Sequence, residues 1–116
     1  MNNKNFKLLK SQILQLIPNI GGCIATDRIT IDGAKVGYMY RSVPTNDDDS
    51  GWRFFAGNES EVYVNDSSNL EIYEVNTIAN YDKSIIPYLN EPFGIQFERM
   101  EDSDLFEKVT SFPLGF

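Results

Sequence analysis

The chain has 116 residues, no histidine and one cysteine, and its 17 acidic against 10 basic side chains give a formal net charge of −7. This length suits one folded domain, and a hydrophobic content of 41% is typical of a globular protein. Without histidine there is no Ser-His-Asp or Cys-His machinery, and a single cysteine allows no intrachain disulfide and no multi-cysteine metal site. The acidic balance argues against a nucleic-acid partner, because binding to a phosphate backbone needs clustered lysine and arginine.

The first segment, residues 4–17, predicts an amphipathic helix that ends at Pro18. Its hydrophobic side chains recur at helical spacing: Phe6, Leu9, Ile13, Leu16 and Ile17. We interpret this stripe as the side of a helix that covers the core. The alternative interpretation is that the helix uses its lysines to bind a partner or a membrane surface. The segment lacks the continuous apolar region of a signal peptide, and no stretch approaches the about 20 apolar residues of a membrane span. A cytoplasmic location without membrane contact is therefore expected.

The rest of the chain predicts short strands and helices. Strands are expected over residues 23–26, 28–31, 35–41, 52–56, 72–78 and 94–99, and short helices near 59–64, 83–89 and 104–109. The Asp32-Gly33 pair is typical of a hairpin turn, and Gly37 inside a strand suggests a bulge or a close backbone approach. The pattern predicts an α+β fold: one small domain over residues 1–116, with a mostly antiparallel sheet of about five strands, an N-terminal amphipathic helix and one or two short helices.

Charge is concentrated in the middle of the chain. Residues 1–26 hold three lysines and no acid, a charge of +3, whereas residues 42–82 hold nine acids and one arginine, a charge of −8. Such a region attracts basic partners, although a solvated surface has the same composition. The acids expected to bind a partner are Asp47, Asp48, Asp49, Glu59 and Glu61.

The segment Trp52-Arg53-Phe54-Phe55 is the most aromatic of the chain. Tryptophan and arginine are common interface anchors, so Trp52 and Arg53 join the candidate partner-binding residues. The competing interpretation, favoured for Trp52 and Phe54, is that both face the core while Arg53 and Phe55 face outward or pack on a helix. As the one base in an acidic stretch, Arg53 is expected to pair with Asp49.

A small-ligand pocket is the second hypothesis for this chain. Tyr38, Tyr40 and Arg41 are its candidate lining residues, together with Trp52 and Arg53. No metal and no cofactor are expected, because the sequence that begins at Asn46 resembles a calcium loop only in its first half and has Gly57 where the bidentate glutamate belongs. Cys23 lies in an apolar run, which predicts a buried hydrophobic residue rather than a reactive thiol.

Several segments resemble the bacterial domain-of-unknown-function family 2185. They are Gly22–Asp27, Lys35–Arg41, Asp49–Glu59, Val75–Asp82, Ile85–Leu89 and Phe97–Arg99, so the resemblance runs from about residue 21 to residue 99. That family is classed as immunity-protein-like, and its members are thought to neutralise toxins of polymorphic or contact-dependent systems. The resemblance implies a non-catalytic protein that binds a cognate toxin, and it supplies no catalytic residues.

The toxin itself is not named by this resemblance. Many such toxins are nucleases and therefore basic, and an acidic inhibitor is steered onto a basic partner. A regulatory or small-ligand binding module is the alternative function.

Overall fold

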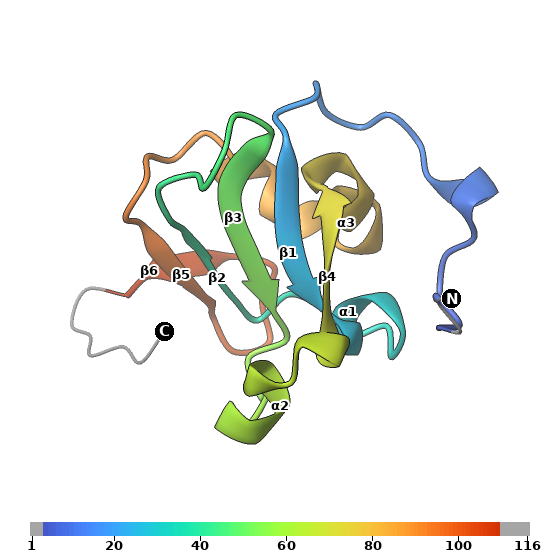
Figure 1. Cartoon of the computed structure of the whole chain (residues 1–116). Helices are drawn as coiled ribbons and strands as arrows, with labels where there is room; N and C mark the ends of the chain where they lie inside the picture. Colours follow the sequence, from blue (N-terminus) through green and yellow to red (C-terminus); the bar gives the residue numbers. More distant parts are fainter. Residues whose placement is uncertain (1–3, 110–116) are drawn as a thin grey trace.

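The computed structural model describes residues 4–109, and these residues form a six-stranded sheet with short helices (Figure 1). The strands lie in the order β4-β1-β3-β2-β5-β6, and of these neighbouring pairs only β1 and β3 run parallel. In chain order the elements are η1 (Lys10–Gln12), β1 (Gly22–Thr26), α1 (Asp27–Thr30), β2 (Tyr38–Arg41), β3 (Asp49–Phe55), α2 (Glu61–Asn65), η2 (Ser67–Asn69), β4 (Leu70–Glu74), α3 (Val75–Tyr81), η3 (Lys83–Tyr88), β5 (Gln96–Arg99) and β6 (Phe106–Lys108). The predicted α+β class with a mostly antiparallel sheet is confirmed.

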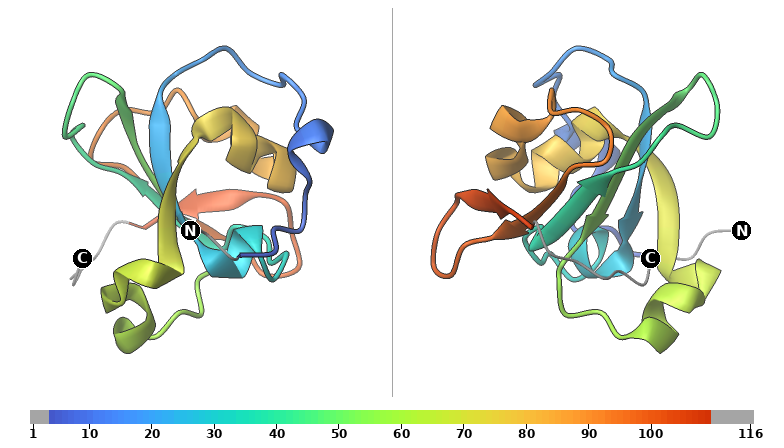
Figure 2. Two further views of the ribbon diagram at one scale, coloured as in Figure 1. Left: turned by 45° about the vertical axis from the view of Figure 1, so that its right-hand side comes forward. Right: turned by 90° about the vertical axis from the view of Figure 1, so that its left-hand side faces the viewer.

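One side of the sheet, here called the core face, carries the hydrophobic core. Trp52 and Phe54 are fully buried on it, and their rings stack with centroids 5.9 Å apart. The helices α3 and η3 lie behind the strands of Figure 1 and cover this side, as the turned views of Figure 2 show. The strands and helices contribute further buried side chains to the core: Cys23, Ala25, Ile29, Met39, Val75, Ile78, Ala79, Ile85 and Phe97. The predicted core positions of Trp52 and Phe54 are therefore confirmed.

The opposite side, here called the open face, is turned toward the viewer in Figure 1. Among the described residues, no helix crosses in front of β1, β3 and β2 on this side. Side chains alternate between the two faces along a strand, and the pairing registers therefore assign the members of the open face. They include Ile24, Tyr38, Tyr40, Arg53, Phe55, Ile72, Glu74, Gln96, Glu98 and Glu107.

The prediction of an N-terminal helix over residues 4–17 is wrong. The described part of this segment is extended apart from the single turn η1, because side chains of α3 satisfy its backbone groups. Asn76 accepts hydrogen bonds from the backbone N–H groups of Leu16 and Ile17 at 2.8 and 3.2 Å, and it donates to the carbonyl oxygen of Leu14 at 2.8 Å. Asn80 holds both backbone groups of Leu14 in the same way. A segment tied down by these long-range bonds does not need helical bonds of its own.

Residues 28–31 were predicted as a strand, which is also wrong. Residues 27–30 form α1, and the backbone N–H of Gly33 bonds to the carbonyl oxygen of Ile29 at 3.2 Å. Gly33 has a φ of 78°, so the Asp-Gly pair supplies the left-handed residue that follows a helix rather than a hairpin. The expected close approach at Gly37 is confirmed, because a β-carbon there would collide with the carbonyl oxygen of Ala56.

Two boundaries in the second half of the chain also differ from the prediction. The strand expected over 72–78 ends at Glu74, and Val75, Ile78 and Ala79 then recur at helical spacing and are buried in α3. The helix expected over 104–109 is instead β6, which pairs with β5 through a turn where Asp102 has a φ of 53°. The second difference comes from tertiary pairing, which a local pattern does not contain.

Candidate functional site

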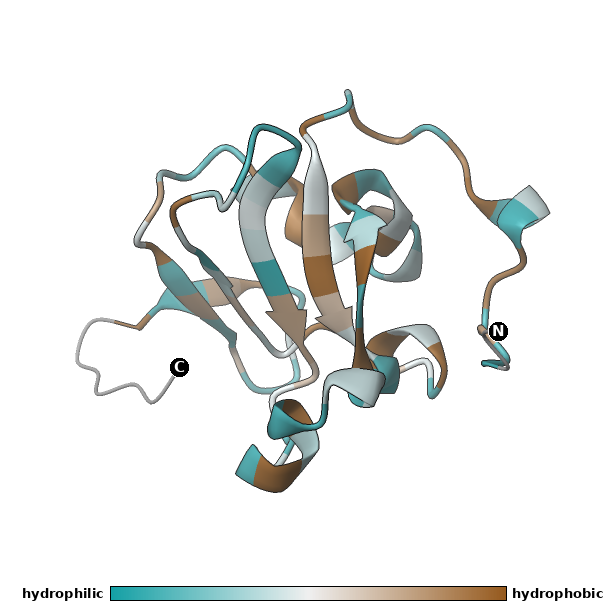
Figure 3. Cartoon of the chain, viewed as in Figure 1, coloured by the Kyte–Doolittle hydropathy of each residue, from teal (hydrophilic) through white to brown (hydrophobic). Residues whose placement is uncertain are grey.

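The acids predicted to act together lie at two ends of the sheet. Asp47 and Asp48 are exposed in the loop between β2 and β3, which is hydrophilic in Figure 3, whereas Glu59 and Glu61 follow the far end of β3. The seven residues of β3 separate the two groups by about 20 Å at roughly 3.3 Å per residue. The −8 stretch of sequence is therefore divided in space into two acidic regions.

Asp49 and Arg53 form the ion pair that the sequence predicts. The guanidinium Nη1 and Nη2 atoms lie 2.9 and 2.8 Å from Oδ1 and Oδ2 of Asp49, and both side chains are 10% exposed. Asp49 also accepts hydrogen bonds from the backbone N–H groups of Thr45 and Gly51, each at 2.9 Å. The Arg53 guanidinium holds the pKa of Asp49 well below its usual range. This pair anchors the start of β3 on the open face.

Glu59 also has a local role. Its carboxylate accepts hydrogen bonds from the hydroxyl of Thr26 at 2.6 Å and from the backbone N–H groups of Ala56 and Gly57 at 2.7 and 2.8 Å. These bonds close the loop after β3. Of the five acids named from the sequence, Asp47, Asp48 and Glu61 are the ones whose side chains are exposed.

The residues of the predicted small-ligand pocket lie on different faces. Arg41 lies on the core-face side beside the fully buried Trp52, and it donates to the carbonyl oxygens of Ser50 and Glu91 at 2.9 and 2.8 Å. Tyr38 and Tyr40 lie on the open face. The structure therefore does not bring Tyr38, Tyr40 and Arg41 together around one cavity. Trp52 donates its indole N–H to the carbonyl oxygen of Leu89 at 3.2 Å and has no exposed surface.

The open face carries an aromatic cluster that was not predicted from the sequence. The rings of Tyr38, Tyr40 and Phe55 lie with centroids 5.8 to 6.0 Å apart. Burial, followed by the neighbouring Tyr40 and Glu98, raises the pKa of Tyr38 to about 12, so its phenol stays neutral at physiological pH. The signal for this cluster was the alternation that put Tyr38 and Tyr40 on one face, but joining them to Phe55 requires the β2–β3 register.

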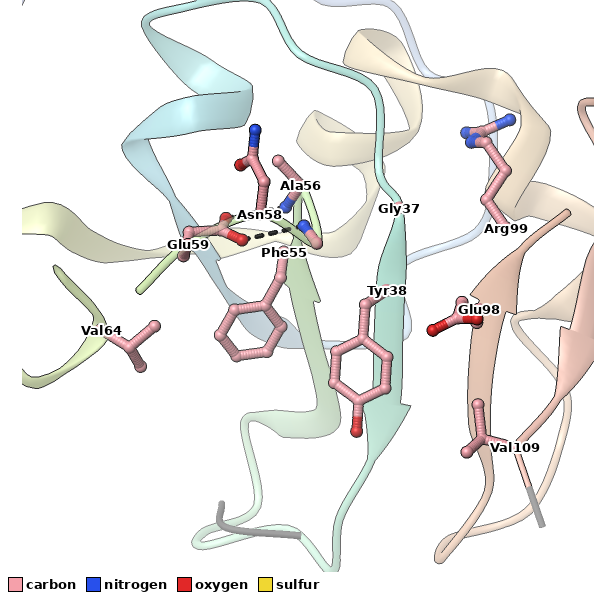
Figure 4. Close-up of a pocket in the computed structure, with 11 residues that line it drawn as sticks. Gly37, Tyr38, Phe55, Ala56, Asn58, Glu59, Val64, Glu98, Arg99 and Val109 are labelled. Carbon is pink, nitrogen blue, oxygen red and sulfur yellow. Dashed lines mark hydrogen bonds between the residues drawn. The ribbon is translucent and has the colours of Figure 1, made fainter. Parts of the chain in front are cut away.

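A hollow of about 590 Å³ lies at the end of the open face next to this cluster (Figure 4). Tyr38 and Phe55 form its aromatic wall, and Glu98 projects beside Tyr38. Val64 of α2 and Val109 lie on its rim. Glu59 and Arg99 also line the hollow, so aromatic, aliphatic, acidic and basic residues meet at one concave part of the open face.

A family model described as the immunity protein Imm33 domain matches residues 23–110, which is most of the chain and includes all six strands. The chain belongs to this family. Membership implies neutralisation of a cognate toxin by an immunity protein of a typically non-catalytic class. The expectation of an immunity-like, non-enzymatic protein is therefore confirmed at the level of the family. No curated protein and no solved structure matches the chain.

Other features of the Imm33 domain fit a protein that binds. Cys23 is 1% exposed, and burial raises the pKa of its thiol, which confirms the predicted buried position. Within residues 4–109, no three acidic or cysteine side chains are grouped so that they could hold a metal ion. In the same range, every helix is too short or too polar to cross a lipid bilayer. These structural roles leave the open face and its hollow unassigned.

Proposed function

We propose that the chain is a stoichiometric inhibitor that binds its cognate toxin over the open face of the sheet. The observation that carries this proposal is an aromatic cluster on a face that no described helix crosses, in which Tyr38 and Tyr40 are half-buried and Phe55 is buried. Aromatic side chains are enriched at the centres of protein interfaces. Ile72, which is 78% exposed on β4, extends the apolar part of this face.

Exposed acids at the two ends of β3 steer the toxin during association. Asp47 and Asp48 lie at one end and Glu61 at the other, so a basic partner approaching the open face is attracted from both sides. The proposed partner is a basic protein toxin, of which a nuclease is one class. Asp49, Arg53, Glu59 and Trp52 act indirectly, because their contacts hold β3 and its loops in place.

The proposal also covers the related family, the extent of the domain, its partners and its location in the cell. The resemblance to domain-of-unknown-function family 2185 between residues 21 and 99 supports the same role. Residues 1–116 act as one immunity domain without nucleic acid, membrane or cofactor as partner. The protein works in the cytoplasm, where it protects the cell that makes the toxin.

The test begins with the gene next to the one that encodes this chain, because a toxin gene there supplies the partner. Calorimetry with the purified toxin is expected to give one-to-one binding, and the toxin's activity should fall in proportion to the bound fraction. A chain that leaves the toxin active at saturating concentration would contradict the proposal.

Charge reversal tests the steering role separately. Asp47→Lys with Asp48→Lys is expected to lower the association rate about tenfold at low salt and to weaken its salt dependence. Asp32→Lys with Glu101→Lys is the matched control, since both acids are exposed and lie away from the β2–β3 loop. Equal association rates for the two double variants would refute steering by Asp47 and Asp48.

A further inference from the structure

The sheet has two outer edges, and β4 forms one of them (Figure 1). The backbone N–H of Val75, just after β4, bonds to the carbonyl oxygen of Gly21, just before β1, at 3.1 Å. Backbone groups of an antiparallel strand point alternately toward and away from a neighbouring strand, so those of Tyr73 face β1 and those of Ile72 point out of the sheet. The edge of the sheet at β4 is therefore lined by backbone donors and acceptors.

Four backbone groups of β4 point outward without a partner in the described part of the chain. The N–H of Leu70 bonds to the carbonyl oxygen of Ser67, and Glu74 is the residue before α3, so its carbonyl starts the hydrogen bonding of that helix. This leaves the C=O of Leu70, the N–H and C=O of Ile72 and the N–H of Glu74, to which no residue between 4 and 109 forms a hydrogen bond. Ile72 is 78% exposed, so the middle of this strand lies in solvent.

The described part of the N-terminal segment meets β4 on the core-face side. Its Phe6 ring stands edge-on to the ring of Tyr73, with centroids 6.2 Å apart, and Lys4 forms an ion pair with Glu71 at 3.1 Å. Tyr73 and Glu71 alternate with Ile72 along the strand and therefore lie on the core face. These contacts use side chains and do not involve the outward backbone groups of β4.

The two edges of the sheet differ. β6, the other outer strand, has three residues, and the N–H of Phe106 already donates to the hydroxyl of Tyr88 at 2.9 Å. Proteins commonly protect exposed edges with short strands, lysine, proline or bulges. β6 is short and carries Lys108, whereas the five residues of β4 include no lysine or proline and pair with β1 in an unbroken register. β4 is therefore the edge that is suited to accept another strand.

The surface beside this edge is acidic. A second hollow, of about 720 Å³ and here called the β4 hollow, is lined by Ile72 and Glu74 of β4 and by Asp47 and Asp48 of the β2–β3 loop. Within residues 4–109, none of these three acids forms an ion pair. A second copy of the chain would bring the same acids and its own net charge of −7 to the edge, whereas a basic partner is attracted. Charge therefore favours the toxin over a second copy.

We propose that an extended segment of the toxin adds to the edge of β4 as a seventh strand. This inference rests on the proposed function, because it takes the toxin as the partner. The outward N–H and C=O groups of β4 then pair with backbone groups of the added strand, which is the hydrogen bonding that extends a sheet. Side chains opposite each other on paired strands interact, so an apolar side chain of the segment lies opposite Ile72 and a lysine or arginine lies opposite Glu74.

Proline at position 72 tests the backbone pairing. Ile72→Pro removes an N–H that points away from β1, so the sheet keeps its own hydrogen bonds. Lys108→Pro is the matched control, because Val109 donates to Gln96 at 3.0 Å and alternation turns the N–H of Lys108 out of the sheet at β6. In surface plasmon resonance with the purified toxin, Ile72→Pro is expected to dissociate about tenfold faster than the native chain, and Lys108→Pro at the native rate. Equal dissociation rates for the two variants would overturn the proposal.

Amide hydrogen exchange measures the same pairing in the native sequence. The full-length, ¹⁵N-labelled chain is followed by NMR, alone and in complex with the toxin. Without toxin, the amides of Ile72 and Glu74 should exchange fast, and that of Tyr73, which faces β1, slowly. The toxin should slow exchange at Ile72 and Glu74 by about tenfold or more. Unchanged exchange at both amides in the complex would overturn the strand addition, even if Ile72→Pro fails to fold.

Other occupants of the edge give different results. Slow exchange at Ile72 and Glu74 that becomes faster as the toxin-free chain is diluted would assign the edge to a second copy. Slow exchange at every dilution would show that the chain's own residues outside 4–109 pair with β4. Either result would overturn the proposal.

A second pair of variants tests the basic side chain of the added strand. Glu74→Lys places a cation opposite the one expected from the toxin and should weaken toxin binding about tenfold. Glu107→Lys is the matched control, since it reverses an exposed acid of the open face on β6, at the other edge of the sheet, and should change the affinity by about twofold or less. An equal loss in both variants would show only a general charge effect and would refute the lysine or arginine opposite Glu74.

The proposed function and the strand addition can fail separately. If the toxin is bound and inhibited, but dissociates equally from the native chain and Ile72→Pro, the strand addition is refuted and the proposed function stands. If the amides of Ile72 and Glu74 are protected in the complex but the toxin stays active at saturation, the proposed inhibition is refuted and the strand addition stands.

Discussion

Replacement of Asp49 by asparagine is expected to destabilise the fold strongly although it changes few atoms. Oδ1 of Asp49 accepts from Arg53 Nη1 and the Gly51 N–H, and Oδ2 accepts from Arg53 Nη2 and the Thr45 N–H. Each oxygen therefore faces one guanidinium donor and one backbone donor. Whichever way the asparagine amide is oriented, its NH₂ group meets two donors and loses two hydrogen bonds.

The size of the effect follows from these lost bonds. Hydrogen bonds to charged groups contribute about 1.5–3 kcal/mol, and an Arg53 that is 8% exposed would keep its charge without the partner. We expect Asp49→Asn to lower the free energy of unfolding by about 2–4 kcal/mol. In a domain of this size that corresponds to a fall in Tm of about 8–16 °C.

Thermal and urea unfolding, followed by circular dichroism, measure this change. Asp48→Asn is the matched control, since it removes the same charge one residue earlier from an exposed side chain, and its effect should stay within about 0.5 kcal/mol. If Asp49→Asn and Asp48→Asn unfold at the same urea concentration, the Asp49–Arg53 pair does not stabilise the fold as described.

Three further predictions concern acidity, charge repulsion and the N-terminal segment. Folding lowers the pKa of Asp49, so the stabilising contribution of this carboxylate is complete above about pH 4 and declines below it. The urea unfolding midpoint should therefore fall further on acidification in the native chain than in Asp49→Asn. Glu107→Gln removes the charge opposite Glu98 and should raise the free energy of unfolding by about 0.2–1 kcal/mol, which is seen as a higher Tm. A lower Tm would contradict the repulsion. Asn76→Ala leaves the backbone N–H groups of Leu16 and Ile17 without their partner and should cost about 1–3 kcal/mol in urea unfolding, whereas an unchanged midpoint would show that these bonds do not hold the segment.

Features that depend on local alternation could be predicted from the sequence. The period of two along β3 separates Trp52 and Phe54 from Arg53 and Phe55. The lack of other bases nearby predicts that Arg53 pairs with a neighbouring acid, for which Asp49 was a candidate, and the structure has this pair. The acidic composition and the missing histidine favoured a protein that binds over one that catalyses a reaction. These are properties of single segments or of the whole composition, so no knowledge of the pairing was needed.

Features that depend on distant partners could not be predicted in this way. Residues 4–17 have helical periodicity, yet Asn76 and Asn80, which are about 60 residues later, hold the segment extended. The Glu98–Glu107 pair exists only because β5 and β6 meet in one particular register. Likewise, acids that are close in sequence, such as Asp48 and Glu59, lie apart because β3 runs between them.

The stabilising and the binding groups are thus interleaved along β2 and β3. On β3, Trp52 and Phe54 hold the core face, while Arg53 secures the β2–β3 loop through Asp49. On the open face, Tyr38 and Phe55 lie next to an acidic pair that weakens the sheet.

Cross-saturation NMR of the complex with the cognate toxin tests the central claim most directly. The chain is deuterated with protonated isoleucine and leucine methyl groups, and the unlabelled toxin is irradiated. We predict that saturation reaches Ile24 and Ile72 on the open face and does not reach Leu14, which is 62% exposed on the segment held by α3. Saturation of Leu14 with none at Ile24 and Ile72 would show that the toxin binds elsewhere.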